Sequence, residues 1–334
     1  MKILFLTSQT NDYMEDCLLH GLRQILDSDL VDYPKKKHMY KEQNNQKSIV
    51  HGLGFTLTGL LPDIDIDRSN VIEKIRNNYF DYIIFPCIYR QYDIFADLHQ
   101  NLIPEKTIFV DGSDSTRHLA ELTFYIKKTF KFKSPRIFKQ SHYFKRELTK
   151  RTYIRFPDNF FGKVLNIFFP TDRSNIKSIT FGIPEEKIIK KFPIKSKLWP
   201  THIVDNEISQ EVSGSYSTYA FDNEKDYYSD LQNAKYGITT KRAGWDCMRH
   251  YEIAANGAVI CFKNLNEKPK SCAPHDLIPG VNCISYNSFP DLKNKINNLS
   301  PQKYSKIQAG GLDWVRNKTT KHIANKLLND IGAK

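Results

Sequence analysis

The residues best suited to binding chemistry lie in one short segment, residues 240–252, which reads TKRAGWDCMRHYE. The apolar run before it predicts a strand and the residues after it predict a helix, so the segment spans a helix N-terminus. Backbone N–H groups and the positive end of the helix dipole favour an anion there, and a diphosphate fits such a position. Arg side chains can grip phosphate with two hydrogen bonds. The predicted contacts are Thr240, Lys241, Arg242, Gly244, Trp245, Asp246, Arg249 and Glu252.

Glu252 and Arg249 are three positions apart, which places both side chains on one face of the predicted helix. In a ligand site, the Glu252 carboxylate would accept hydrogen bonds from ribose hydroxyl groups. The same spacing is also that of a surface ion pair worth only about 0.3 kcal/mol, and Trp245 also fits a core position. The sequence leaves both interpretations open.

The elements around this segment follow one another without long gaps. We expect a helix over 223–233 with Asp222 as its N-cap, a strand over 236–239, a helix over 247–256 and a strand over 258–262. Gly257 allows the sharp turn between the last two elements. Strand, anion site, carboxylate and turn therefore occur in the right order for an anion-binding unit.

The N-terminal part alternates short apolar strands with helices. The expected strands are 2–6, 30–33, 82–85 and 107–110, and the expected helices are 15–26, 67–78 and 94–102. This alternation indicates a parallel, doubly wound α/β sheet whose functional loops lie at the carboxyl ends of its strands. Further strands are expected at 164–169, 178–181, 201–204 and 283–286, and one long helix over 302–331 with a weak point at Gly310 and Gly311.

Carboxylates and imidazoles near these strand ends are candidates for a general base that takes a proton from a hydroxyl group. The predicted catalytic residues are Asp111, Asp114 and His20, and Glu15 and His118 are also available. Asp111 and Asp114 lie in the sequence DGSD, which equally fits a turn with an N-cap.

The net charge of +12 is concentrated in residues 127–155, which hold eleven Lys and Arg residues and one acidic residue, Glu147. This basic block fits a solvated surface, and it also fits contact with a lipid diphosphate or an anionic membrane surface. Lys145 and Arg146 are the predicted contacts to such an acceptor or phosphate. Aromatic residues are interleaved, but no RNA-binding signature accompanies them, so we expect no nucleic-acid partner.

Three further patterns bear on metal and location. The six cysteines have no CxxC pair and no zinc-type spacing with His, as in reduced cytoplasmic proteins. The apolar run 3–6 is too short for a signal peptide or a membrane span, so we expect a cytoplasmic protein, at most peripheral to the inner face of a membrane. Asp63, Asp65 and Asp67 have Asp-x-Asp spacing, but they lead into a predicted helix and favour a capping role over Mg²⁺ or Mn²⁺ binding. We expect no metal and no other cofactor.

Several of these residues together carry a family resemblance. Tyr227, Leu231 and the run YGI at 236–238 are followed by Arg249-x-x-Glu252 and by NGAVI at 256–260. This pattern resembles the donor-binding half of GT-B glycosyltransferases, most closely the exostosin-like and CgeB-like groups. The resemblance covers residues 221–286, and the N-terminal half is similar only in its Rossmann-like layout.

The resemblance implies an α/β fold with two Rossmann-like domains facing a cleft. An acceptor domain would span 1–185, a linker 186–200, and a nucleotide-sugar domain with the long C-terminal helix 201–334. The implied enzyme is a glycosyltransferase that moves a sugar from a nucleoside-diphosphate sugar to a saccharide, lipid-linked or protein acceptor. Arg249 and the 240–246 loop would face the diphosphate, and Glu252 the ribose or the sugar.

One departure from the family pattern affects the chemistry. The common retaining pattern has two glutamates eight positions apart, whereas the position eight before Glu252 is Gly244. We therefore expect an inverting transfer. We also expect it to be metal-independent, with Arg249, Lys241, Arg242 and the helix start stabilising the leaving diphosphate. The alternatives are a non-catalytic nucleotide-sugar or polyanion-binding protein on the same scaffold, and a metal-dependent enzyme that uses the Asp-x-Asp motif.

Overall fold

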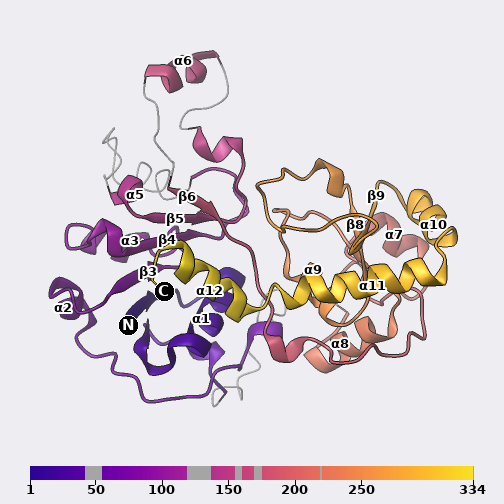
Figure 1. The fold of residues 1–334 in the computed structure, drawn as a ribbon, viewed down its shortest axis with the longest axis horizontal. Coiled ribbons are helices and arrows are strands. Elements are labelled where there is room, and N and C mark those ends of the chain that lie inside the picture. Colours follow the sequence, from indigo (N-terminus) through magenta and orange to yellow (C-terminus); the bar gives the residue numbers. More distant parts are fainter. Residues whose placement is uncertain (42–54, 119–136, 155–159, 169–174, 219, 334) are drawn as a thin grey trace.

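Two α/β units lie side by side in the computed structural model, which describes residues 1–41, 55–118, 137–154, 160–168, 175–218 and 220–333 (Figure 1). Within these residues the first unit has a six-stranded sheet and the second a three-stranded sheet. All neighbouring strands in both sheets are parallel. The predicted α/β class with two Rossmann-like units is confirmed.

The first sheet has the strand order β2-β1-β3-β4-β5-β6. Its strands are β1 (Ile3–Leu6), β2 (Leu30–Tyr33), β3 (Tyr82–Phe85), β4 (Thr107–Asp111), β5 (His142–Lys145) and β6 (Ile176–Ser178). In β1, Ile3 and Phe5 pack into one apolar cluster and Leu4 and Leu6 into another. Both faces of the strand are therefore buried, which explains its uninterrupted apolar sequence.

Helices cover both faces of this sheet. These helices are α1 (Tyr13–Leu26), α2 (Val71–Arg76), α3 (Tyr92–Leu98) and α5 (Ile137–Gln140). The unit also has helix α6 (Phe160–Phe168), which projects away from the sheet, and short 3₁₀ helices η1 (Asp27–Asp29), η2 (Lys37–Met39), η4 (Phe55–Leu57), η5 (Pro104–Lys106), η6 (Lys150–Tyr153) and η7 (Glu185–Lys187). The side chain of Asp12 caps α1 by accepting hydrogen bonds from the backbone N–H groups of Met14 and Glu15. This cap places the start of α1 at the carboxyl end of β1.

The second unit has the sheet order β7-β8-β9. Its elements are α7 (Asn206–Glu211), α8 (Glu224–Asn233), β7 (Tyr236–Thr239), α9 (Met248–Ala255), β8 (Val259–Lys263), η8 (Leu265–Glu267), β9 (Cys283–Tyr286), α10 (Phe289–Asn297) and α11 (Pro301–Arg316). Gly257 adopts φ +68°, as the turn from α9 into β8 requires. The N-cap of α8 is Asn223 instead of the predicted Asp222.

One element inside the basic block was not predicted, and one prediction after the block was wrong. The chain forms β5 inside the block, where no strand was predicted, because Tyr143 and Phe144 alternate between the two apolar clusters beside the sheet. The predicted strand at 164–169 falls mostly on α6, and residue 169 lies outside the described residues. A short apolar run fits a helix and a strand equally well, since periodicity alone cannot separate them.

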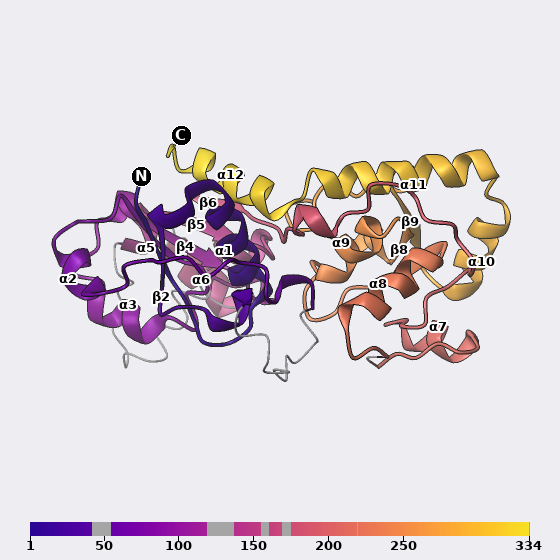
Figure 2. The same cartoon turned by 90° about the horizontal axis from the view of Figure 1, so that it is seen from below.

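The single long C-terminal helix was also a wrong prediction. The chain forms α11 and then a separate helix α12 (Thr320–Asp330), with Thr319 capping α12 through its side chain. The weak point is therefore at residues 317–319, while Gly310 and Gly311 stay helical. Figure 2 shows α11 and α12 along one edge of both units, with α12 beside α1 of the first. The last helix of the chain thus ties the two units together.

Two smaller differences concern α2 and residues 201–204. The helix expected at 67–78 is limited to α2, and residues 201–204 form no strand, only an isolated bridge between His202 and Tyr216.

Across the described ranges, none of the helices combines the length and the apolar character needed to span a membrane.

Candidate functional site

A cavity lies between the two units, where the starts of α1 and α9 approach each other. The centres of water-sized groups can occupy about 90 Å³ of it, and it is open to solvent on one side. The first unit contributes Tyr13 and Phe55, and the second contributes His202, Ala220, Phe221, Tyr227, Cys247, Met248, Arg249 and Glu252. Of the residues predicted to bind the donor, Arg249 and Glu252 therefore line the cavity.

The start of α9 forms one wall of the cavity and gives it positive charge. Cys247 takes the extended N-cap conformation but makes no side-chain capping hydrogen bond in the described structure. Cys247, Met248 and Arg249 all line the cavity, so the positive end of the α9 dipole and a guanidinium lie at one wall. This arrangement is suited to an anionic group.

Glu252 lies one turn further along α9, and hydroxyl groups from both units hold its carboxylate. Thr56 donates to Oε1 at 2.5 Å, and Tyr227 donates to Oε2 at 2.8 Å. Tyr228 and Thr56 share a further hydrogen bond of 2.9 Å between their hydroxyl oxygens. Burial raises the pKa of Glu252, although these hydrogen bonds oppose the shift. The simple surface ion pair considered for Glu252 is therefore not its environment.

The loop before α9 divides into an exposed and a buried part. Lys241 and Arg242 are exposed and Thr240 is half-buried. The pKa of His202 in the cavity wall is lowered first by burial, and then by the charge of Arg249. Trp245 is buried against Phe262, with ring centroids 6.2 Å apart. Of the two interpretations of Trp245, the core position is the one observed.

Asp246 was predicted to bind the donor, but its carboxylate serves the fold. It accepts hydrogen bonds from the Phe181 backbone N–H (3.0 Å), the Thr180 hydroxyl (3.2 Å) and the Tyr251 hydroxyl (2.8 Å). Asp246 is buried, and burial raises its pKa. The side chain therefore faces the segment after β6, and Asp246 is not among the residues that line the cavity.

Gly244 is a glycine for a steric reason. A Cβ atom at this position would lie 2.5 Å from Oε1 of Glu147 and 2.7 Å from Oδ1 of Asp114. Both neighbours belong to the first unit, so the loop closes directly onto two of its carboxylates. A glutamate here would clash with them and repel them, which explains the departure from the two-glutamate pattern.

Asp111 and Lys145 form a buried ion pair. Their side chains are fully buried, with 2.7 Å between the Lys145 Nζ and Asp111 Oδ1 atoms, and Tyr143 donates to the other oxygen of Asp111. The β4–β5 register places the two residues opposite each other. Burial disfavours ionisation of Asp111, but the Lys145 ammonium holds the pKa of that carboxyl below its usual value. Neither residue lines the cavity, and both side chains are closed off from solvent.

Arg146 also serves the fold instead of reaching outward for an acceptor. It is 2% exposed and donates to the backbone carbonyl of Asp246 at 2.6 Å and to Glu147 at 3.1 Å. It also pairs with Asp114, whose side chain is 52% exposed. His20 is buried, 2.8 Å from the Thr320 hydroxyl. Among the three predicted catalytic residues, only Asp114 therefore reaches solvent.

The Asp-x-Asp acids lie on the outer surface of the first unit. Asp63 pairs with Lys35, and Asp67 pairs with Lys74. Neither acts as the N-cap of α2, because that position is taken by Asn70. In the part of the chain that the structure describes, no three His, Cys, Asp or Glu side chains come together as metal ligands.

His250 supports the site from inside α9 and was missed in the sequence. Its ring nitrogens lie 3.0 Å from the Thr239 hydroxyl and 2.9 Å from the Trp245 carbonyl oxygen. Burial lowers the pKa of His250 to about 3, so the ring is neutral. The residue joins the end of β7 and the 240–246 loop to the helix. Tyr227 was named in the family pattern, but nothing in the sequence linked Thr56 or Phe55 to this place.

Comparison with known proteins places this arrangement in a wider context. No family model and no curated protein sequence matches the chain. Among solved structures, HepE from Anabaena in complex with UDP and glucose matches with a TM-score of 0.57 and 11% identity over 100% of both chains. A glycosyltransferase from Rickettsia africae matches with a TM-score of 0.53 and 11% identity over 99% of this chain and 98% of the other.

A third match is sucrose-phosphate synthase from Thermosynechococcus elongatus, with a TM-score of 0.51 and 10% identity over 99% of both chains. At such low identity these similarities establish the fold alone. The chain has the fold of the GT-B glycosyltransferases, with its cavity between the two units.

Proposed function

We propose that the protein is a glycosyltransferase that transfers a sugar from a nucleoside-diphosphate sugar to a saccharide, lipid-linked or protein acceptor. One observation carries the proposal: the cavity between the units brings together the start of α9, Arg249 and Glu252. A helix N-terminus with a guanidinium suits a diphosphate, and a carboxylate one turn away suits ribose or sugar hydroxyl groups.

The remaining wall fits the apolar parts of such a donor. Phe221 and Tyr227 lie with ring centroids 5.9 Å apart at the cavity, and Phe55 and Tyr13 face it from the first unit. Aromatic rings bury the faces of a base or a sugar well. In this proposal Lys241 and Arg242, which are exposed in the loop before α9, attract the anionic donor.

The reaction would be an inverting displacement without a metal. The acceptor hydroxyl oxygen forms a bond to the anomeric carbon, and the bond from that carbon to the diphosphate oxygen breaks. Arg249 and the α9 N–H groups stabilise the charge that develops on the leaving diphosphate. The hydroxyl proton goes to a carboxylate, and we propose Asp114 because it is half-exposed and adjoins Gly244.

The ion pair between Asp114 and Arg146 favours a second candidate, a non-catalytic nucleotide-sugar-binding protein. A carboxylate held by a guanidinium is a weaker base, because the positive charge stabilises its ionised form. Both candidates share the donor site, so binding and turnover must be measured separately.

Calorimetry with UDP, GDP and their sugars, with EDTA present throughout, tests the donor site. We expect one class of nucleoside diphosphate to bind and Arg249→Ala to weaken it about tenfold or more, as for a lost charged hydrogen bond. Arg76→Ala is the matched control, since Arg76 is exposed on α2, far from the second unit (Figure 1). Equal binding by the Arg249 variant and the wild type would contradict the proposal.

A donor-hydrolysis and transfer assay then separates the two candidates. Turnover in EDTA that falls in Asp114→Asn supports the metal-independent enzyme. Binding without turnover for any acceptor supports the non-catalytic protein, and turnover only after Mn²⁺ is restored supports the Asp-x-Asp alternative.

A further inference from the structure

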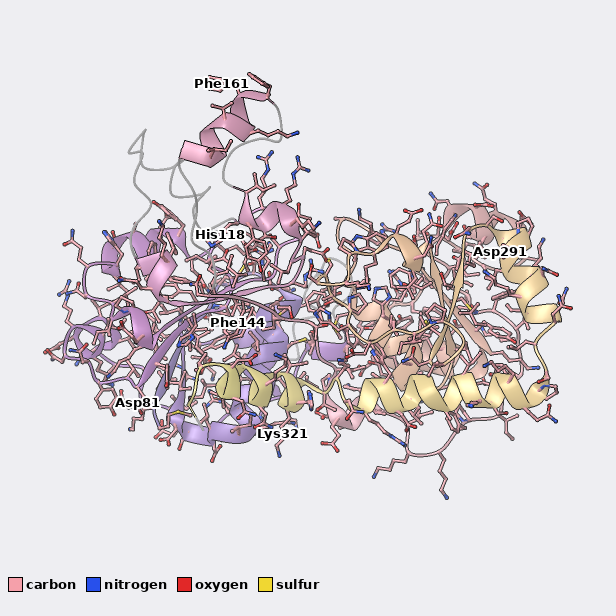
Figure 3. The ribbon with its side chains drawn as sticks, turned by 45° about the horizontal axis from the view of Figure 1, so that its top comes forward. Asp81, His118, Phe144, Phe161, Asp291 and Lys321 are labelled. Atoms are coloured by element: carbon pink, nitrogen blue, oxygen red, sulfur yellow. The ribbon has the colours of Figure 1, made fainter. Side chains whose placement is uncertain are left out.

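Helix α6 presents large apolar side chains to solvent. Phe160 is 86% exposed, Phe161 70% and Ile167 75%, although most other Phe residues with described burial are buried. The helix lies between β5 and β6 in the chain and projects from the first unit, with Phe161 at its outer side (Figures 1 and 3). Large apolar side chains exposed together on one helix indicate a surface that is covered by something else.

Exposed positive charge accompanies this apolar face. Lys150 and Arg151 are exposed on η6, which lies on the same side of the first unit as α6 (Figures 1 and 3). Lys163 is exposed on α6 itself, and Tyr153 at the end of η6 is 42% exposed. The surface therefore combines apolar rings, an aromatic hydroxyl and basic side chains.

The fold anchors η6, so its basic residues have a defined direction. Thr149 and Thr152 form a reciprocal capping box at the start of η6. The buried Thr152 hydroxyl also donates to the backbone carbonyl of Thr116 at 2.7 Å. With Thr152 turned inward, Lys150, Arg151 and Tyr153 are the residues of η6 that face outward.

We propose that the surface made by η6 and α6 docks the protein on an anionic lipid bilayer. An interfacial helix buries its apolar side chains at the boundary between headgroups and acyl chains, while Lys and Arg stay at the headgroups. Basic side chains next to such a helix are attracted by the negative surface potential of anionic lipids. The opposite charge of the bilayer is the reason to choose it over a second copy of this basic chain.

This surface differs from the one expected in the sequence. Lys145 and Arg146 are buried and cannot meet a membrane, whereas Lys150 and Arg151, a few residues later, can. Docking here rests on the exposed surface and not on the proposed reaction. If both hold, the first unit faces the bilayer, and a lipid-linked acceptor becomes the favoured class.

Vesicle flotation tests the proposal with the full-length protein. We expect the wild type to bind phosphatidylcholine vesicles that contain phosphatidylglycerol, to bind pure phosphatidylcholine much more weakly, and to be released by salt. The double variant Phe160→Glu/Phe161→Glu should lose at least tenfold in vesicle affinity. Ile194→Glu is the matched control, because Ile194 is 91% exposed outside this surface.

Charge is tested in the same way. Lys150→Glu/Arg151→Glu should lower binding to anionic vesicles, while the control Lys190→Glu/Lys191→Glu, with the same charge change at exposed positions, should lower it less. Equal losses in the two charge variants would overturn a specific docking surface in favour of general attraction by net charge.

Two further measurements separate bilayer docking from donor binding and from self-association. Nucleotide affinity should be unchanged in the Phe160/Phe161 variant, so a failure of docking does not depend on the donor site. Light scattering should show the same oligomeric state for wild type and variant. A wild-type oligomer that dissociates in the variant would overturn the proposal and assign the surface to self-association.

Discussion

The Glu252 carboxylate is held by one hydroxyl group from each unit, Thr56 from the first and Tyr227 from the second. A ribose or sugar hydroxyl would have to join or replace these donors. Thr56 is therefore a positioning residue in the proposed donor site, because it orients Glu252 without reacting itself. Its place next to the cavity also makes Glu252 sensitive to the relative position of the two units.

We expect Thr56→Val to raise the KM for the donor about tenfold with little change in kcat, since a hydrogen bond to a carboxylate contributes roughly 1.5 kcal/mol. Thr56→Ser should restore the KM. Loss of the Thr56 hydroxyl also raises the pKa of Glu252 further. As the pH is lowered, affinity for the sugar donor should therefore begin to fall at a higher pH in the valine variant. A merely structural role would lower the thermal midpoint and leave the pH profile unchanged.

His250 makes the stability of the second unit depend on pH. In the folded protein the pKa of His250 is lowered to about 3, whereas an unfolded histidine titrates near its ordinary value of about 6.5. Such a depressed pKa stabilises the fold above pH ~6.5, and this contribution is lost as the pH falls. At pH 5 the loss is about 2 kcal/mol.

Urea unfolding of the wild type and His250→Gln at pH 7 and pH 5 measures this contribution. The variant should be less stable at pH 7 because the hydrogen bonds to Thr239 and Trp245 are disturbed. The difference between the two proteins should shrink at pH 5, since glutamine does not titrate. A difference in the free energy of unfolding that is independent of pH would contradict a neutral buried imidazole.

At the scale of elements, strands and helices with a clear apolar periodicity could be predicted from the sequence. Helix ends that depend on packing between distant segments could not. Residues 82–85 and 236–239 read as strands because they are apolar and bounded by turns, and they are β3 and β7. The break before α12 was missed because it depends on the docking of that helix on α1, which no local pattern reports. The site was predictable where one helix carries it, at Arg249 and Glu252.

The same limit explains why several predicted site residues have their charge paired within the fold. Asp111, Lys145 and Asp246 are charged side chains that the fold buries, and burial of a charge requires partners from distant segments. Thr180, Phe181 and Tyr251 supply them for Asp246. A charged residue at a strand end or helix start looks the same in sequence whether it meets a ligand or such partners.

The contact between α1 and α12 gives a prediction with an unusual sign. A Cβ atom at Gly21 would lie 2.9 Å from Cβ of Ala324 and closer still to the backbone of Thr320. Gly→Ala inside a helix normally stabilises by about 1 kcal/mol. We expect Gly21→Ala to destabilise instead, by about 1–3 kcal/mol, because the two helices must separate.

Thermal unfolding measures this effect, with Ser305→Ala on an exposed position of α11 as the control. The control should leave the midpoint almost unchanged. A Gly21→Ala protein that melts at or above the wild-type temperature would show that α12 is not packed on α1 in solution.

For the whole molecule, a buried polar link near the cavity joins the two units. Arg146 and Glu147 of the first unit bind the backbone carbonyl and N–H of Asp246, and the Asp246 carboxylate binds the Phe181 N–H. Together with α12, this link holds the two units against each other. It also sets the distance across the cavity, because Asp246 ends the loop that leads into α9.

The final prediction concerns this link. Asp246→Asn keeps the shape of the side chain, but it removes the negative charge near Arg146. It also turns one carboxylate oxygen into an amide NH₂ group, which faces the Phe181 N–H or the Tyr251 hydroxyl, both of them hydrogen-bond donors. We expect the free energy of unfolding to fall by about 1–3 kcal/mol. Asp313→Asn is the matched control, since the Asp313 side chain is 71% exposed and should change stability little. Because Asp246 does not line the cavity, donor affinity should fall less in Asp246→Asn than in Arg249→Ala. If calorimetry with the same nucleotide shows that Asp246→Asn weakens binding more than Arg249→Ala does, Asp246 belongs to the donor site.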